Sequence, residues 1–214
     1  MINYLKNLNR LKKYIYHNKS VFKKKNDSRN IILLEKFDYY PSIIPISHFI
    51  ERLEKKFNAS TTLYEVELTS SLRKKFRSIA DKYFPFSFNK IYSSFGCNNK
   101  VSNKHNSEID PQAKSSLEKL LKMIKTKKDI LEIKIDNLII GDLIYDTYLR
   151  NNKKPTIEIQ SKEFKNFLLN FLNLFFYWKN FFNINAKKIK AVVVSHDVYH
   201  FALPIRFCCN LKIP

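Results

Sequence analysis

Four residues in the segment ILEIKIDNLIIGDLIYDTYLR (residues 130–150) have types and spacing that could support acid–base chemistry. Gly141 and Asp142 stand where an extended segment gives way to a helix, and such a place often requires a positive φ or a close backbone approach. Asp142 is positioned to cap this helix through its carboxylate. Asp146 and Arg150 follow at i+4 and i+8, so the three charged side chains share one helix face. Spacing alone favours a capped helix with an Asp146–Arg150 ion pair over a catalytic site.

A second cluster follows the apolar run KAVVV at residues 190–194, whose composition predicts a buried parallel strand. Ser195, His196 and Asp197 fall at the carboxyl end of this strand, the edge at which open α/β sheets bind ligands. His196 could act as a general base or hydrogen-bond a sugar hydroxyl. It could equally be a structural residue that caps the next helix.

The segment HDVYH places His196 and His200 in a pattern close to a zinc-binding helix motif. Zinc would require both histidines on one helix, whereas the valine run places His196 at a strand end, and the sequence offers no third ligand. We therefore expect no metal and no cofactor. A helix is predicted from Leu203 to Asn210, and Tyr199 and Arg206 complete the candidate substrate contacts.

The elements that must position these residues alternate between strand and helix. Strands are predicted at 31–37, 61–68, 88–95 and 190–194, and helices at 46–57 (with Pro45 in the first turn) and 72–83. Because strand–helix–strand order favours right-handed βαβ units, we predict an α/β, Rossmann-like fold with one mostly parallel sheet and helices on both faces.

Further elements surround the first cluster. Residues 131–136 alternate as a strand would, Asp136-Asn137 can turn the chain, and residues 138–140 can run back. Asp110-Pro111 reads as an N-cap and first residue of a helix. The aromatic helix at 161–183 is apolar around most of its circumference, yet no apolar run approaches the ~20 residues of a membrane span, so we expect it in the core.

The net charge of +20 suggests a nucleic-acid partner, but the composition argues against one. Lys accounts for 32 of the 39 basic residues, and it is accompanied by much Asn, Ile, Phe and Tyr and by two glycines. A coding bias toward A and T would give this profile whatever the function. Nucleic-acid sites favour Arg for bidentate contacts, and the chain has no zinc-finger spacing or RNP-like motif.

Cysteine content and the N-terminus bear on location. Cys97, Cys208 and Cys209 cannot form a disulfide framework, and the first thirty residues contain no signal peptide, so a cytosolic compartment is expected. Residues 1–26 contain eight basic and no acidic residues, with apolar positions at helical spacing. This segment could dock on anionic lipid headgroups, or it could be a solvated terminus.

Residues 129–214 resemble bacterial surface and capsular polysaccharide biosynthesis proteins, which look like glycosyltransferases of the two-Rossmann (GT-B) type. The similar segments are IGDLIYDTYLR, KPTIEI, FFYWKNFF and AVVVSHDVYHFALPIR, while residues 30–110 fit only in pattern. The resemblance implies transfer of a sugar from a nucleotide-activated donor to a growing glycan without a metal. It implies that a C-terminal domain binds the donor and that the N-terminal one supplies the acceptor site and the base.

We assign the catalytic role to Asp142 and His196, and the substrate-binding role to Gly141, Asp146, Arg150, Ser195, Asp197, Tyr199 and Arg206. The chain departs from the family pattern because it stops at Pro214, before a second Rossmann domain. We expect residues 1–28 to be a basic segment and residues 29–214 a single Rossmann-like domain. This acceptor-side half would be inactive alone and peripheral at the inner membrane face. The alternatives are a non-catalytic binding or scaffold fragment and a basic nucleic-acid-binding domain.

Overall fold

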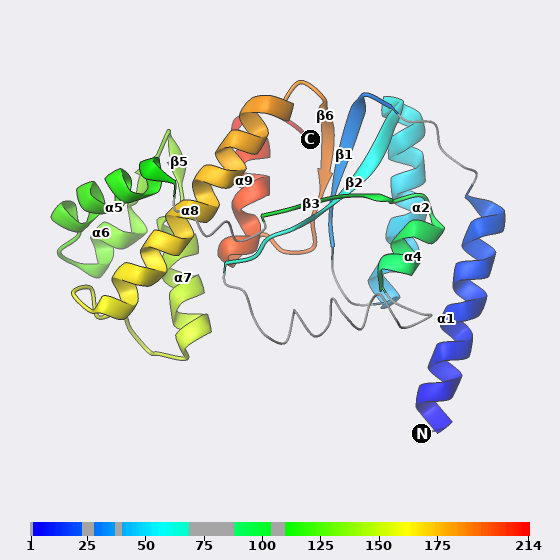
Figure 1. Cartoon of the computed structure of the whole chain (residues 1–214), viewed down its shortest axis with the longest axis horizontal. Helices are drawn as coiled ribbons and strands as arrows, with labels where there is room; N and C mark the ends of the chain where they lie inside the picture. Colours follow the sequence, from blue (N-terminus) through cyan, green and yellow to red (C-terminus); the bar gives the residue numbers. More distant parts are fainter. Residues whose placement is uncertain (1, 23–27, 37–39, 69–87, 104–109) are drawn as a thin grey trace. The chain divides into compact units, whose positions relative to one another are not determined.

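The computed structural model describes residues 2–22, 28–36, 40–68, 88–103 and 110–214 (Figure 1). The chain forms two compact units, which are described separately. The first unit comprises Met1–Glu65, Ser70–Val101 and Lys188–Val193. The second comprises Val66–Thr69, Ser102–Lys187 and Val194–Pro214. The nine predicted site residues all belong to the second unit.

The first unit is built on a four-stranded sheet with the strand order β3-β2-β1-β6. Its strands are β1 (Asn30–Glu35), β2 (Ala59–Glu65), β3 (Asn99–Ser102) and β6 (Ile189–Val193). β1 pairs in parallel with β2 on one side and with β6 on the other. The predicted α/β class and Rossmann-like sheet are thereby confirmed, as are the strands expected at 31–37, 61–68 and 190–194, with shifted ends.

Helix α2 (Tyr40–Phe57) joins β1 to β2 and completes a βαβ unit. It begins earlier than predicted, so that Pro45 lies inside the helix and not in its first turn. The helix ends at Phe57 because Asn58 adopts a positive φ of 45°. The Asn30 side-chain amide donates to the carbonyls of Phe57 and Asn58, at 3.1 and 3.3 Å, so the first residue of β1 ties down the end of α2.

The strand predicted at 88–95 is wrong, because this segment forms helix α4 (Phe88–Ser94). Ile91, Tyr92 and Phe95 are fully buried, at a spacing that places them on one face of a helix. Gly96 then adopts a φ of 94°, and the Cys97 amide donates to the Tyr92 carbonyl at 3.0 Å, as at a glycine-terminated helix end. The helix predicted at 72–83 lies outside the described residues.

Helix α1 (Ile2–Val21) packs against α4 and contributes to the core of the first unit. Leu11 is buried in the same apolar cluster as Ile32 and Leu34 of β1, and Ile15 packs against that cluster. The buried side-chain amide of Asn18 donates to Ser94 Oγ at 2.9 Å. Leu11 and Ile15 of α1 therefore pack within the protein, while Lys12, Lys13 and Lys19 on the same helix are exposed.

The second unit is mainly helical. Its elements are α5 (Pro111–Met123), α6 (Lys127–Leu131), the hairpin of β4 (Lys134–Ile135) and β5 (Leu138–Ile139), α7 (Gly141–Asn152), α8 (Lys162–Asn185), the 3-10 helix η1 (Tyr199–Ala202) and α9 (Leu203–Asn210). α8 contacts α5, α7 and α9, and its aromatic side chains form the centre of the unit. The five most deeply buried of these are Phe164, Phe171, Phe175, Trp178 and Phe182.

Several local predictions for this unit are confirmed. α8 and α9 occupy the expected segments, and the Asp110 carboxylate caps α5 by accepting from the Gln112 amide at 2.8 Å. Asp136 and Asn137 form the predicted turn, with φ values of 50° and 66° that suit a tight hairpin. The strand expected from residue 131 is shorter than predicted, because Leu131 ends α6. Among the described helices, none has the length and apolar character needed to cross a bilayer.

The packing of α1 predicts that Leu11→Ala destabilises the protein by about 2–4 kcal/mol, because the substitution leaves a cavity in the core of the first unit. Lys12→Ala is the matched control, since Lys12 is exposed on the same helix and its loss should cost less than about 0.5 kcal/mol. Denaturant unfolding, together with amide hydrogen exchange across α4, would measure the difference. Equal stability of the two variants would show that α1 does not belong to the core.

Candidate functional site

The two predicted clusters meet within the second unit. η1 packs directly against α7, and the backbone N–H of His200 donates to Thr147 Oγ1 at 2.8 Å. Both residues are buried, although they lie 53 positions apart in the sequence. This contact holds the segment that follows Val194 against the helix that begins at Gly141.

Gly141 begins α7 at a close contact between two stretches of backbone. A Cβ at this position would lie 2.1 Å from the Ile130 carbonyl oxygen and 2.4 Å from that of Leu131. The amides of Ile140 and Gly141 also donate to the Ile133 carbonyl, at 3.0 and 3.2 Å. The sequence predicted either a positive φ or a close backbone approach at Gly141, and the structure shows the close approach.

Asp142 does not cap α7 as predicted, because Ile140 occupies the N-cap position and no side chain caps the helix there. Its Oδ2 instead pairs with Nη2 of Arg206 on α9 at 2.5 Å. Oδ1 is buried and has no hydrogen-bond partner among the described residues, although the side chain as a whole is 41% exposed. The carboxylate therefore links α7 to α9, a geometry that suits a positioning role better than that of a general base.

Arg150 is held by an aromatic ring and not by Asp146. Its guanidinium carbon lies 4.4 Å from the centroid of the Tyr199 ring, within the range of a cation–π contact. In the described part of the chain, Asp146 forms no ion pair with Arg150, so the pairing that spacing favoured is wrong. Tyr199 also has a φ of 57°, which is unusual for a bulky residue and occurs where the surrounding structure enforces it.

His196 is exposed and comes shortly after the end of β6, as predicted. Ser195 Oγ lies 2.8 Å from His196 Nδ1, and the imidazole ring lies 5.5 Å from the ring of Phe201. Asp197 is also exposed. The arrangement gives an oriented imidazole at the surface, next to the segment that carries Tyr199.

The geometry does not assemble a metal centre or a cysteine nucleophile from the described residues. His196 precedes η1 and His200 lies within it, so the HDVYH segment is not a helix with two ligands on one face. No group of three His, Cys, Asp or Glu residues in the described ranges is arranged to hold a metal ion. Burial, together with the neighbouring Cys209, raises the pKa of Cys208 to about 12, so this thiol stays protonated at neutral pH.

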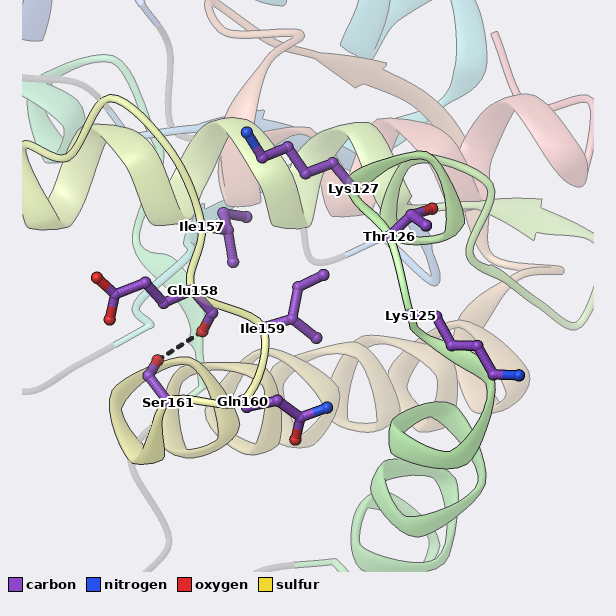
Figure 2. Close-up of a pocket in the computed structure, with 8 residues that line it drawn as sticks. All are labelled: Lys125, Thr126, Lys127, Ile157, Glu158, Ile159, Gln160 and Ser161. Carbon is purple, nitrogen blue, oxygen red and sulfur yellow. Dashed lines mark hydrogen bonds between the residues drawn. The ribbon is translucent and has the colours of Figure 1, made fainter.

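A groove of about 580 Å³ in the second unit lies among residues that the sequence did not single out (Figure 2). Ile157 and Ile159 occupy its centre, and lysines and polar side chains surround them. The lining residues are Lys125, Thr126, Lys127, Ile157, Glu158, Ile159, Gln160 and Ser161. Three features of the sequence could have indicated this groove. Two are the helix caps, Thr126 for α6 and Ser161 for α8, and the third is the extended segment around Pro155.

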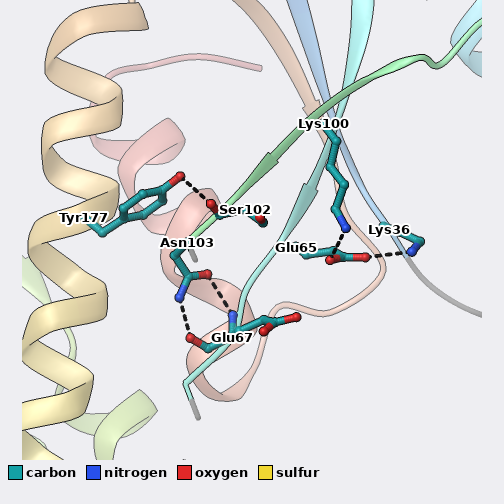
Figure 3. A network of polar contacts seen from close by, with 7 residues as sticks. All are labelled: Lys36, Glu65, Glu67, Lys100, Ser102, Asn103 and Tyr177. Carbon is teal, nitrogen blue, oxygen red and sulfur yellow. Dashed lines mark hydrogen bonds and ion pairs between the residues drawn. The ribbon is translucent and has the colours of Figure 1, made fainter. Parts of the chain in front are cut away.

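Polar side chains also gather near the ends of the sheet strands (Figure 3). In the first unit, Glu65 at the end of β2 pairs with Lys36 at 2.8 Å and with Lys100 at 2.5 Å. Burial raises the pKa of Glu65, but the hydrogen bonds and positive charges of the two lysines outweigh it and hold the pKa below its ordinary value. Sequence reasoning missed this triad because its members come from three separate elements.

In the second unit, the polar contacts of Figure 3 join α8 to Ser102 and join Asn103 to Glu67. The Tyr177 hydroxyl donates to the Ser102 carbonyl at 3.0 Å. Asn103 Oδ1 accepts from the Glu67 amide at 2.9 Å, and its Nδ2 donates to the Glu67 carbonyl. These bonds satisfy backbone groups, and we assign them a structural role.

No family model, curated protein or solved structure matches this chain. Its function is therefore inferred from the chemistry and placement of its own residues.

The contact at Gly141 predicts that Gly141→Ala is strongly destabilising, by roughly 2–4 kcal/mol, because the added methyl group would push α7 away from the backbone of α6. Asn151→Ala is a suitable control, since Asn151 is exposed near the end of the same helix. Chemical denaturation followed by the fluorescence of Trp178, which lies in this unit, would report the loss. An unchanged midpoint for Gly141→Ala would mean that α7 can begin elsewhere.

The charged triad of Lys36, Glu65 and Lys100 predicts that Glu65→Gln lowers the stability at pH 7 by about 1–3 kcal/mol, because the Lys36 side chain, which is only 9% exposed, loses its charged partner. The folded-state pKa of Glu65 is lowered from the ordinary value of 4.5. The stabilisation is therefore complete above 4.5 and disappears as the pH falls through the lowered folded-state pKa. Denaturation curves of wild type and variant should converge in acid and separate at neutral pH. Glu132→Gln, which removes an exposed i,i+4 pair with Lys128, should show little difference at either pH.

Proposed function

We propose that this chain is the acceptor-side half of a glycosyltransferase that acts in bacterial surface polysaccharide synthesis and receives its sugar from a nucleotide-activated donor. The observation that carries the proposal is the meeting of the two clusters, in which Arg150 stacks on Tyr199 close in sequence to the exposed His196. The resemblance of residues 129–214 to capsular polysaccharide proteins supports the same class. In this proposal the donor binds a separate nucleotide-binding domain.

His196 would take the proton of the acceptor hydroxyl as that oxygen attacks the anomeric carbon of the donor sugar, and the nucleotide would leave with the bonding electrons. A sugar hydroxyl is a weak nucleophile, so a base within hydrogen-bond reach is required. The Ser195 hydroxyl, 2.8 Å from Nδ1, would orient the imidazole. The Asp142–Arg206 pair would keep α7 and α9 in register, so we now assign Asp142 to positioning.

The stacked Arg150 and Tyr199 would form the acceptor-binding surface. An aromatic ring packs against the apolar face of a sugar, and a guanidinium donates to hydroxyl or carboxylate oxygens. The exposed Asp146 and Asp197 offer acceptor oxygens for further hydroxyl groups. Gly141 would contribute indirectly, by fixing the start of the helix that carries Arg150.

Attachment to the inner membrane face would be electrostatic. Because Leu11 and Ile15 pack into the core, α1 would contact lipid through Arg10, Lys12, Lys13 and Lys19, which are exposed. Such attraction to anionic headgroups weakens steeply as salt is added.

The proposal predicts that His196→Ala reduces sugar transfer by roughly 10²-fold or more when the chain is supplied with a nucleotide-sugar-binding domain. His17→Ala is the matched control, because His17 is exposed on α1 and lies outside the candidate site. Transfer from labelled nucleotide sugars to isolated cell-surface glycans would be measured, and thermal unfolding would confirm that both variants fold. Full transfer by His196→Ala would exclude His196 as the base.

The acceptor-binding part of the proposal can be tested without the donor domain. Arg150→Ala should weaken retention of the chain on immobilised glycans by about tenfold, whereas Lys153→Ala, just beyond the same helix, should leave retention unchanged. If the unmodified chain binds no glycan but binds RNA at ~0.2 M salt, the acceptor-side proposal is wrong.

A further inference from the structure

We infer that the groove between Lys125–Lys127 and Ile157–Ser161 is a binding site for a nucleoside phosphate, separate from the candidate site around His196 and Arg150. Its volume of about 580 Å³ lies within the range of small-ligand pockets. No residue that lines it belongs to the two clusters discussed above. The inference does not require the proposed transferase function.

The floor of the groove is apolar. Ile157 is buried and Ile159 is half-buried, and Figure 2 shows both side chains at its centre. Two branched aliphatic side chains provide an apolar surface against which one face of a planar heterocycle can pack. A phosphate or a simple sugar would leave this floor uncovered, so the floor favours a ligand with an apolar body.

The wall of the groove offers peptide groups that the protein does not use. The backbone N–H and C=O groups of three lining residues, Ile157, Ile159 and Gln160, make no hydrogen bond to other described residues. Thr156 Oγ1, next to the lining segment, is also buried without a partner in the described chain. Unpaired peptide groups beside an apolar floor can read the hydrogen-bonding edge of a base, and the Gln160 amide adds one further donor and acceptor.

The charge at the rim favours an anion. Lys125 and Lys127 are exposed, and neither forms an ion pair with a carboxylate of the described ranges. Their flexible four-carbon stems allow the ammonium groups to move onto a phosphate. Glu158 is the one acidic lining residue, and Figure 2 shows its carboxylate on the side of the groove opposite Lys125. A phosphate beside Lys125 would therefore lie away from Glu158. The nearby Asp129 carboxylate already accepts hydrogen bonds from the amides of Lys125 and Thr126.

Isothermal titration of the full chain with ADP, adenosine and pyrophosphate, at about 0.15 M salt, tests the inference. ADP should bind at one saturable site, and adenosine and pyrophosphate should each bind at least about tenfold more weakly, because each occupies only part of the groove. The double variant Lys125→Gln, Lys127→Gln should raise the Kd for ADP about tenfold. Ile159→Ser, which replaces the more exposed of the two floor residues, should weaken the binding of ADP and adenosine but not that of pyrophosphate.

The matched control is the double variant Lys119→Gln, Lys122→Gln, which removes the same charge from exposed positions of α5 outside the groove. Its Kd for ADP should stay within about twofold of wild type. Amide chemical shifts should change at residues 157–161 when ADP is added. The inference would be overturned if the two double variants weakened ADP binding equally, or if ADP showed no saturable binding. It would also be overturned if the chemical-shift changes were confined to α7 and η1.

Discussion

The close backbone contact at Gly141 determines the geometry of the second unit. The glycine has no side chain, so the first turn of α7 can lie directly on the carbonyls of Ile130 and Leu131. Once this start is fixed, helical geometry sets the directions of every later side chain on α7. Thr147 then receives the His200 amide, and Arg150 reaches the Tyr199 ring. If α7 began at another residue, Thr147 and Arg150 would both be rotated away from their partners.

The sequence predicted well the features that depend on local pattern. The valine run indicated β6, and the aromatic periodicity indicated α8, because a buried strand and a buried helix differ in length and spacing. The Asp136-Asn137 turn followed from the tolerance of these residues for positive φ. Residues 88–95 were predicted as a strand because aromatic residues favour strands, but the helical spacing of the buried side chains and the helix-terminating Gly96 specify a helix.

The candidate site was predicted only in part, because its contacts join distant segments. Local spacing singled out Gly141 and His196, and the structure places the segments that carry them against each other. Spacing could not show that Arg206 pairs with Asp142, since 64 positions separate them and only the packing of α9 brings them together. The i,i+4 spacing within α7 predicted Asp146 as the partner of Arg150. In the structure, Arg150 instead contacts the aromatic ring of Tyr199. The contacts of Glu65 with Lys36 and Lys100 depend on which strands are neighbours in the sheet, and local sequence patterns do not predict the order of the strands.

The pairing of β1 with β6 has a consequence for the order in which the protein folds during synthesis. Ile32 and Ala191 are partners in adjacent strands, yet they lie about 160 residues apart along the chain. β6, which completes this edge of the sheet, thus leaves the ribosome only after all of α5, α6, α7 and α8 have been synthesised. Those helices can form local contacts while β1 still lacks its neighbour. During that interval the edge of β1 is open to other chains, so the nascent protein has a period of increased aggregation risk that ends when β6 emerges.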